Sequence, residues 1–169
     1  MKKLDRILLV DDDEITNFVN ESLIMDTGVA EQVLVAHNGQ EALALLEQRQ
    51  DGKPPSLIFV DINMPVMNGF EFLDAYQQLE ENTRSTATVV MLTSSLNSKD
   101  IERTKKTGIA EFLSKPLTSD KLKKVVAKHF AWLFTLVNRN KDGEGGALSF
   151  CTDKRYRTPV GFHDSLHQR

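Results

Sequence analysis

Short apolar runs alternate with segments of helical periodicity through the first 137 residues of this chain. The apolar runs are residues 7–10, 33–36, 57–60, 88–92 and 112–113. Strict alternation of strands and helices is typical of an α/β domain whose parallel sheet carries helices on both faces. Because right-handed crossovers leave few arrangements, we predict a doubly wound five-stranded sheet in the order 2-1-3-4-5.

The intervening segments predict five helices. The first covers residues 14–26, where Ile15, Phe18, Val19 and Leu23 form one apolar stripe. Asn38 is the predicted N-cap of the second helix, with Glu41 three residues later. The third helix covers residues 70–79 with Phe72, Leu73 and Tyr76 inward, a weak fourth covers 99–106, and Thr118 caps the last from Ser119.

The last helix keeps its helical spacing to Val137, and residues 130–137 are apolar almost all round. Such a surface needs burial, either against its own domain or tail, or in a dimer or partner contact. Residues 138–146 form a polar, glycine-rich linker. We therefore expect one domain over residues 1–137, followed by a linker and short tail over 138–169 without an independent fold.

Composition excludes several classes of protein. Hydrophobic residues make up 40% of the 169 residues, and the net charge of -3 argues against general nucleic-acid binding. Without a signal peptide or membrane-length apolar run, we expect a cytoplasmic protein that is not membrane-bound. The single Cys151 excludes an internal disulfide, and His163 and His167 lack further ligand candidates for a metal.

Chemically active side chains follow four of the predicted strands. Asp11, Asp12 and Asp13 follow the first, Asp61 the third, Thr93 ends the fourth and Lys115 follows the fifth. In open α/β sheets, ligands bind beyond the carboxyl ends of the strands, and strands one and three flank the switch point. Crowded carboxylates repel one another, and a divalent cation with oxygen ligands would relieve that repulsion. Taken singly, each residue also fits a blander role, such as a helix start or a solvated charge.

Acids, a hydroxyl and an ammonium above one sheet edge suit phosphoryl transfer. A carboxylate can act as the nucleophile and form an aspartyl phosphate. Magnesium and a lysine neutralise charge on the transferring oxygens, and a hydroxyl can donate to one of them.

The four motifs together resemble a known family. Val-Asp-Asp, Asp-x-Asn-Met-Pro-x-Met-Asn-Gly, Leu-Thr-Ser and Ser-Lys-Pro follow the first, third, fourth and fifth strands, as in the CheY-like receiver domains of two-component response regulators. The resemblance covers about residues 4–130 and implies their flavodoxin-like (βα)5 fold.

By this resemblance, Asp61 is the phosphoacceptor, and Thr93 and Lys115 contact the phosphoryl oxygens. The ligands of Mg²⁺ or Mn²⁺ are then Asp11, Asp12, Asp61 and the backbone carbonyl of Asn63. Asp13 lies one residue past the acidic pair and is expected to cap the helix. The resemblance also implies a cis bond at Lys115-Pro116.

The resemblance further implies a switch in which Thr93 moves inward and the aromatic Phe112 changes rotamer. That change would remodel the surface of helix four, strand five and helix five, where a downstream protein would bind. Asn63 and Ser95 match the positions that tune dephosphorylation, and both are small and uncharged.

We therefore expect a stand-alone response regulator that takes a phosphoryl group from a sensor histidine kinase or phosphotransfer protein. It would not be an enzyme beyond its own phosphotransfer and autodephosphorylation, and it could form a homodimer. An intermediate phosphorelay carrier is the alternative within the family. A haloacid-dehalogenase-like phosphatase would use Asp11-x-Asp13, but this chain lacks the later acidic pair that such an enzyme needs, and that interpretation leaves Asp61 unexplained. A flavoprotein of the same fold would need a phosphate-binding first loop, and acidic residues occupy that place in this chain.

Overall fold

The computed structural model describes residues 3–48, 53–79, 87–94, 111–131 and 133. All of them belong to the first of two units, Met1–Arg139, and the second unit is Asn140–Arg169. The elements are β1 Leu4–Val10, α1 Glu14–Thr27, β2 Ala30–Ala36, α2 Gly39–Glu47, β3 Leu57–Asp61, α3 Gly69–Gln78, β4 Thr88–Thr93, β5 Glu111–Ser114 and α5 Ser119–His129. The helix predicted over residues 99–106 lies outside the described residues.

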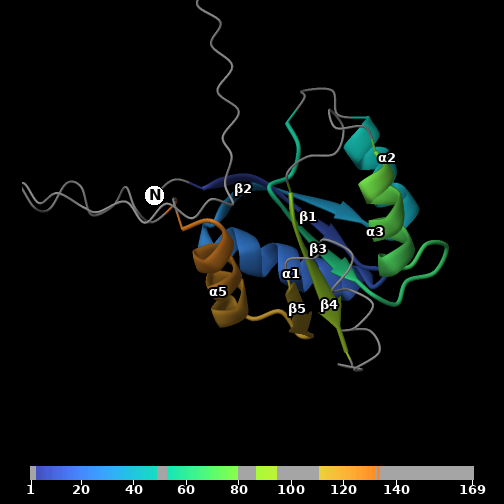
Figure 1. Ribbon diagram of the computed structural model, residues 1–169. Helices are drawn as coiled ribbons and strands as arrows, with labels where there is room; N and C mark the ends of the chain where they lie inside the picture. Colours follow the sequence, from blue (N-terminus) through green and yellow to red (C-terminus); the bar gives the residue numbers. More distant parts are fainter. Residues whose placement is uncertain (1–2, 49–52, 80–86, 95–110, 132, 134–169) are drawn as a thin grey trace, which may run out of the picture. The chain divides into compact units, whose positions relative to one another are not determined.

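The five strands form one parallel sheet in the order β2-β1-β3-β4-β5, as predicted (Figure 1). β1 lies between β2 and β3, so the strand order reverses there. Val10 pairs with Val60 in the β1–β3 register. An aspartate follows each of these two valines in the sequence. Asp11 and Asp61 therefore lie side by side at the carboxyl edge of the sheet.

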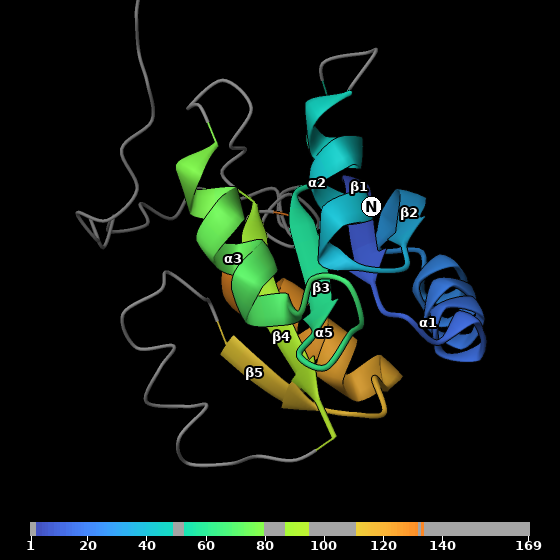
Figure 2. The ribbon, with the colours of Figure 1, turned by 90° about the vertical axis from the view of Figure 1, so that its right-hand side faces the viewer.

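Helices cover both faces of this sheet, and each face has its own core (Figures 1 and 2). Alternate residues of β1 supply the two cores: Ile7 and Leu9 pack with α1 and α5, whereas Leu8 and Val10 pack with α2 and α3. Side chains on a strand point alternately to opposite faces, which explains why residues 7–10 of β1 are all apolar. Such a strand is buried on both faces and holds the site rigidly from below.

Most of the apolar stripe predicted for α1 is exposed, whereas its last residue, Leu23, packs against the core. Ile15 and Phe18 are 74% and 70% exposed, and Val19 is exposed as well. The buried residues of α1 are instead Asn17, Asn20 and Ile24. The helix starts directly after the acidic loop, and the Asn17 amide donates to the Asp11 carbonyl at 2.7 Å. This bond to the end of β1 fixes which side of α1 turns inward.

Helix starts follow the predicted capping residues. The Asn38 side chain accepts from the Glu41 N–H, although the Glu41 carboxylate accepts from the His37 N–H rather than from that of Asn38. Thr118 caps α5 by accepting from the Lys121 N–H. In α3, the predicted inward residues Phe72, Leu73 and Tyr76 are all buried. Sequence reasoning missed the cap of α3, where Asn68 and Glu71 form a complete capping box.

The last helix ends earlier than the sequence predicts. α5 stops at His129, and Phe130 adopts φ -129° and ψ 40°, so an uninterrupted helix through Val137 is wrong at this point. Phe130 and Leu133 are buried against residues of β1, β3, β4 and α5. For these two residues, packing on their own domain accounts for the apolar pattern. Residues 134–137 lie outside the described part of the chain.

None of the helices described is long and apolar enough to cross a lipid bilayer.

Candidate functional site

The acidic end of β1 divides into one buried and two exposed aspartates. Asp11 is 2% exposed, and its N–H donates to the Ala36 carbonyl of β2 at 3.1 Å. One Asp11 carboxylate oxygen accepts from the Asp13 N–H at 3.2 Å, which holds the loop in a tight turn. Asp12 is exposed, and it nevertheless belongs to the same cluster of acids.

Asp13 caps α1, as predicted. Its carboxylate accepts from the Ile15 N–H at 2.9 Å and from the Thr16 hydroxyl at 2.8 Å. The Thr16 hydroxyl, followed by the Ile15 N–H, lowers the pKa of Asp13, so this carboxylate is ionised at neutral pH. Asp13 thus serves the positive end of the helix rather than the acidic cluster.

Asp61 is the last residue of β3 and is 6% exposed. Its backbone is closely covered by Gly69, where a Cβ would lie only 2.3 Å from the Asp61 carbonyl oxygen. The Gly69 N–H also donates to the Ile62 carbonyl at 3.0 Å. Glycine at this position therefore lets the start of α3 close tightly over the end of β3. Between them, Val66 adopts a positive φ of 68°, a strained conformation for a β-branched residue.

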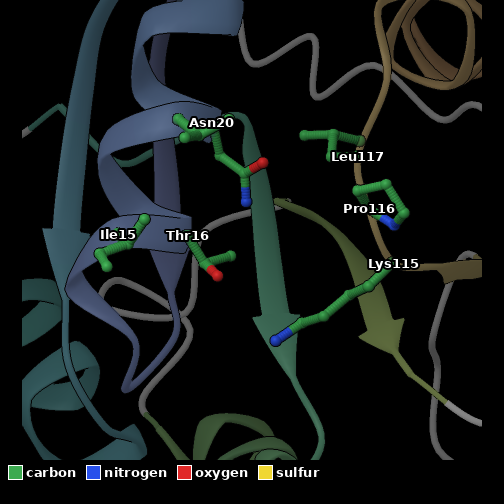
Figure 3. A pocket seen from close by; sticks show the side chains of 7 residues that line it. Ile15, Thr16, Asn20, Lys115, Pro116 and Leu117 are labelled. Atoms are coloured by element: carbon green, nitrogen blue, oxygen red, sulfur yellow. The ribbon is translucent and has the colours of Figure 1, made fainter.

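Lys115 joins the two buried acids. Its Nζ lies 2.7 Å from Asp11 Oδ2 and 3.0 Å from Asp61 Oδ1. The Lys115 N–H donates to the Thr93 carbonyl at 2.8 Å, which fixes its backbone to the end of β4. Figure 3 shows its side chain reaching from the segment after β5 toward the end of β3. The following Lys115-Pro116 peptide bond is cis, as predicted.

Burial and charge act in opposite directions on this pair. Burial raises the pKa of Asp61 above its ordinary value of 3.8, because lost hydration outweighs the attraction of Lys115. Burial alone would lower the pKa of Lys115. Its hydrogen bonds to Asp11 and Asp61 outweigh burial, so the pKa lies above its ordinary value. Lys115 therefore stays charged at neutral pH and offsets part of the negative charge beside Asp61.

The acids also fit a hard divalent cation. Asp11, Asp12 and Asp61 each offer a carboxylate oxygen, and these three oxygens lie within 4.8 Å of one another. An all-oxygen set with excess negative charge is the donor chemistry that Mg²⁺ prefers. Asn63 lies two residues beyond Asp61 in the same loop and is exposed. The residues present thus match the ligand chemistry expected from the sequence.

The remaining predicted residues occupy the β4 and β5 side of the site. Thr93 is buried at the end of β4 and pairs with Ser114 in the β4–β5 register. Phe112 is half-buried in β5 and packs against the core shared with α2 and α3. Ser95 lies outside the described residues.

A pocket of about 400 Å³ opens beside the acidic cluster. Its lining residues are Ile15, Thr16, Val19, Asn20, Lys115, Pro116 and Leu117. In Figure 3, Thr16 and Asn20 extend from α1 into the space facing the segment that carries Lys115. Sequence reasoning missed this pocket, because an apolar stripe on a helix has the same pattern whether it faces a core or lines a pocket. The exposed side chains themselves gave no signal in the sequence.

Comparison with known proteins agrees with this geometry. The sequence model of the response regulator receiver domain matches residues 7–127. The chain belongs to this family. It is 32% identical to the two-component response regulator ORR41 of Oryza sativa, over 75% of this chain and 95% of that protein. It is 33% identical to the hybrid signal transduction histidine kinase B of Dictyostelium discoideum, over 76% of this chain but only 7% of that protein.

Solved structures give the same result. A two-component response regulator from Cytophaga hutchinsonii is 34% identical, with a TM-score of 0.69 over 77% of this chain and 99% of that one. The CheY4 chemotaxis protein of Vibrio cholerae is 28% identical, with a TM-score of 0.64 over 75% and 98%. The CheY-like fold and the two-component signalling class predicted from the sequence are both confirmed.

Proposed function

We propose that Asp61 accepts a phosphoryl group from a phosphohistidine of a sensor kinase or phosphotransfer protein. One observation carries the proposal: the Lys115 ammonium lies between the carboxylates of Asp11 and Asp61 at 2.7 and 3.0 Å. The same two acids lie beside Asp12 in a cluster suited to Mg²⁺. A nucleophile, a fixed cation and a candidate metal site therefore lie together at the carboxyl edge of the sheet.

In the reaction, an ionised oxygen of Asp61 attacks the phosphorus atom. The phosphorus–nitrogen bond of the donor breaks, its electron pair returns to the imidazole, and an acyl phosphate forms on Asp61. Lys115 neutralises charge on a phosphoryl oxygen, and the Thr93 hydroxyl donates to another. Asp11, Asp12, Asp61 and the Asn63 carbonyl would hold Mg²⁺, which would supply further charge neutralisation when bound.

The exposed apolar side of α1 supports a site for the phosphodonor. Ile15 and Val19 line the pocket that also includes Lys115, the residue paired with Asp61, and Phe18 is a third exposed apolar residue of the same helix. A donor that presents its imidazole to Asp61 must cover this neighbouring surface. An apolar helix face of the donor would bury these side chains and remove them from water.

The experiment compares two phosphodonors. Phe18→Gln should slow transfer from a purified phosphorylated histidine donor about tenfold, while acetyl phosphate should modify the variant at the unchanged rate. Leu45→Gln is the matched control, because Leu45 is an exposed apolar residue of α2, on the other face of the sheet. Equal rates from the protein donor for Phe18→Gln and the unsubstituted chain would contradict the donor surface, but not the role of Asp61.

Output through protein contacts is proposed for the β5 side of the domain. Phe112 is half-buried in β5, two strand positions before Ser114, so a rotamer change there would alter apolar exposure at this edge strand of the sheet. A stable phosphoryl mimic should shift the NMR signals of Phe112 and of residues 99–107. Signals unchanged by the mimic would contradict this switch.

We favour a stand-alone regulator over an intermediate relay carrier. The match to ORR41 extends over 95% of that protein, so a receiver domain makes up nearly all of one relative that is named a response regulator. Asn63 and Ser95 would set how fast water removes the phosphoryl group. Incubating the phosphorylated chain with histidine phosphotransfer proteins tests the choice: hydrolysis alone supports a terminal regulator, and onward transfer supports a carrier.

A phosphatase that uses Asp11 as its nucleophile is the distant alternative. Asp11 Oδ2 is 2.7 Å from Lys115 Nζ and the residue is 2% exposed. This alternative also gives no role to the motif that begins at Asp61. Turnover of a phosphatase substrate that survives Asp61→Asn and is lost in Asp11→Asn would favour this alternative.

A further inference from the structure

A second lysine binds the segment that carries Lys115. Lys121 lies in the first turn of α5, and its ammonium donates to the Ser114 carbonyl at 2.5 Å and to the Ser114 hydroxyl at 3.0 Å. It also donates to the Pro116 carbonyl at 2.9 Å. These three oxygens belong to the residues immediately before and after Lys115. All three N–H groups of the ammonium thus have an acceptor on the same short segment.

The position of Lys121 is electrostatically unfavourable for a lysine. A cation in the first turn of a helix opposes the helix dipole. Ordering a long side chain also costs rotamer freedom. Three hydrogen bonds from a charged donor can outweigh both costs. The contacts of Lys121 therefore explain its place in α5.

We propose that Lys121 is a positioning residue, which holds residues 114–116 so that the Lys115 ammonium lies between Asp11 and Asp61. This inference rests on the proposed phosphoryl transfer to Asp61. The Lys115 backbone is already tied to Thr93 on one side by its N–H. Lys121 fixes the carbonyl groups on both sides of Lys115, which leaves little freedom at the base of its side chain. Phosphoryl transfer depends on such placement, and errors of about 1 Å can cost about 10²-fold in rate.

The other lysines of α5 provide internal controls. Lys123 and Lys124 are exposed on the same helix, and Lys128 pairs with Glu111 at the start of β5. Lys124→Met removes one positive charge from α5 while leaving the contacts of Lys121 intact. Lys121→Met removes the same charge together with the three hydrogen bonds, and it keeps most of the apolar stem.

The test compares Lys121→Met, Ser114→Ala and Lys124→Met in the full chain, with acetyl phosphate and Mg²⁺. Lys121→Met should lower the saturated rate of aspartyl phosphate formation about tenfold, because a displaced Lys115 ammonium no longer meets the transferring group in the productive geometry. Ser114→Ala removes one of three acceptors and should give a smaller loss. Lys124→Met should react at the unchanged rate. Urea unfolding, measured alongside, confirms that each variant is folded under the assay conditions.

A spectroscopic readout separates positioning from a merely structural role. The Lys115 ammonium hydrogens, held between two carboxylates, should give a protected ¹⁵N-correlated signal that Lys121→Met shifts or broadens and Lys124→Met does not. If Lys121→Met keeps both the rate and the Lys115 signal, the inference is wrong even when Asp61 is phosphorylated. If the unsubstituted chain takes up no phosphoryl group, the proposed function fails, whereas a Lys115 signal that depends on Lys121 still supports the positioning role.

Discussion

Asp12 and Asp13 are neighbours in the chain but have different environments. Asp13 is bound to the first turn of α1, whereas Asp12 belongs to the cluster with Asp11 and Asp61. The sequence already suggested this division, because an acid directly before a helix is a typical N-cap. The burial of Asp11 at the end of β1 also follows from the apolar strand that precedes it.

Alanine substitutions at these two positions should therefore have opposite signatures. Asp12→Ala should weaken Mg²⁺ binding at least tenfold, because it removes a charged ligand from the set. Asp13→Ala should lower the urea midpoint through loss of the cap and leave Mg²⁺ affinity within about twofold. Calorimetric titration and urea unfolding measure the two quantities. A comparable loss of Mg²⁺ affinity in both variants would contradict the division.

The raised pKa of Asp61 predicts that its charge opposes folding. Below its ordinary pKa of 3.8, Asp61 is neutral in both the folded and the unfolded chain, so Asp61→Asn changes little there. As the pH rises, the unfolded chain ionises first, and the unsubstituted protein loses stability relative to Asp61→Asn until the folded pKa is passed. At pH 7 with a chelator present, Asp61→Asn should therefore have the higher urea midpoint. An equal or lower midpoint would show that Lys115 outweighs burial.

At the level of elements, the rotation of α1 was beyond the reach of sequence periodicity. The pattern showed an apolar stripe and a polar side. The polar side can face the sheet when its side-chain amides find hydrogen-bond acceptors there. The structure turns Asn17 and Asn20 inward and leaves Phe18 outside. The hydrogen bond from Asn17 to the Asp11 carbonyl accompanies this orientation. Periodicity of apolar residues does not predict such a side-chain to backbone bond.

Two alanine variants of α1 test this orientation. Ile24→Ala should lower the free energy of unfolding by about 2–5 kcal/mol, because Ile24 is fully buried in the core with α5. Phe18→Ala should change it by less than about 0.5 kcal/mol, since Phe18 lies in water. Chemical denaturation compares the two, and a larger loss for Phe18→Ala would show that the stripe faces the core.

The start of α3 must approach the end of β3 closely. Gly69→Ala places a Cβ against the Asp61 carbonyl, so backbone must move and the free energy of unfolding should fall by about 1–3 kcal/mol. The rate of modification by acetyl phosphate should fall as well. Gly28→Ala is the control. An alanine at φ 66° is strained and lowers stability, but Gly28 lies at the end of α1 that is far from the site. A modification rate unchanged by Gly69→Ala would contradict the coupling.

For the whole domain, the alternation of strands and helices predicted a doubly wound parallel sheet, and chirality left only a few strand orders to choose from. The order chosen from these is the observed one, and it brings Asp11, Asp61, Thr93 and Lys115 to one edge of the sheet. The end of α5 and the supporting bonds from Lys121 did not follow, because they depend on which side chains happen to face each other after folding. Local patterns carry no record of such tertiary contacts.

The apolar C-terminal run tests packing at this scale. Leu133 is 3% exposed within the core of α1 and α5, so Leu133→Ala should lower the free energy of unfolding by about 2–5 kcal/mol. Sedimentation velocity should show the same oligomeric state for the variant and the unsubstituted chain. A changed oligomeric state without loss of stability would instead place Leu133 in a contact between copies.

Mass spectrometry of the intact chain after treatment with acetyl phosphate and Mg²⁺ tests the central role of Asp61. We predict the addition of a single phosphoryl group, which requires Mg²⁺ and does not occur in Asp61→Asn. Modification that persists in Asp61→Asn, or an unsubstituted chain that takes up no phosphoryl group, would contradict the assignment of Asp61 as the phosphoacceptor.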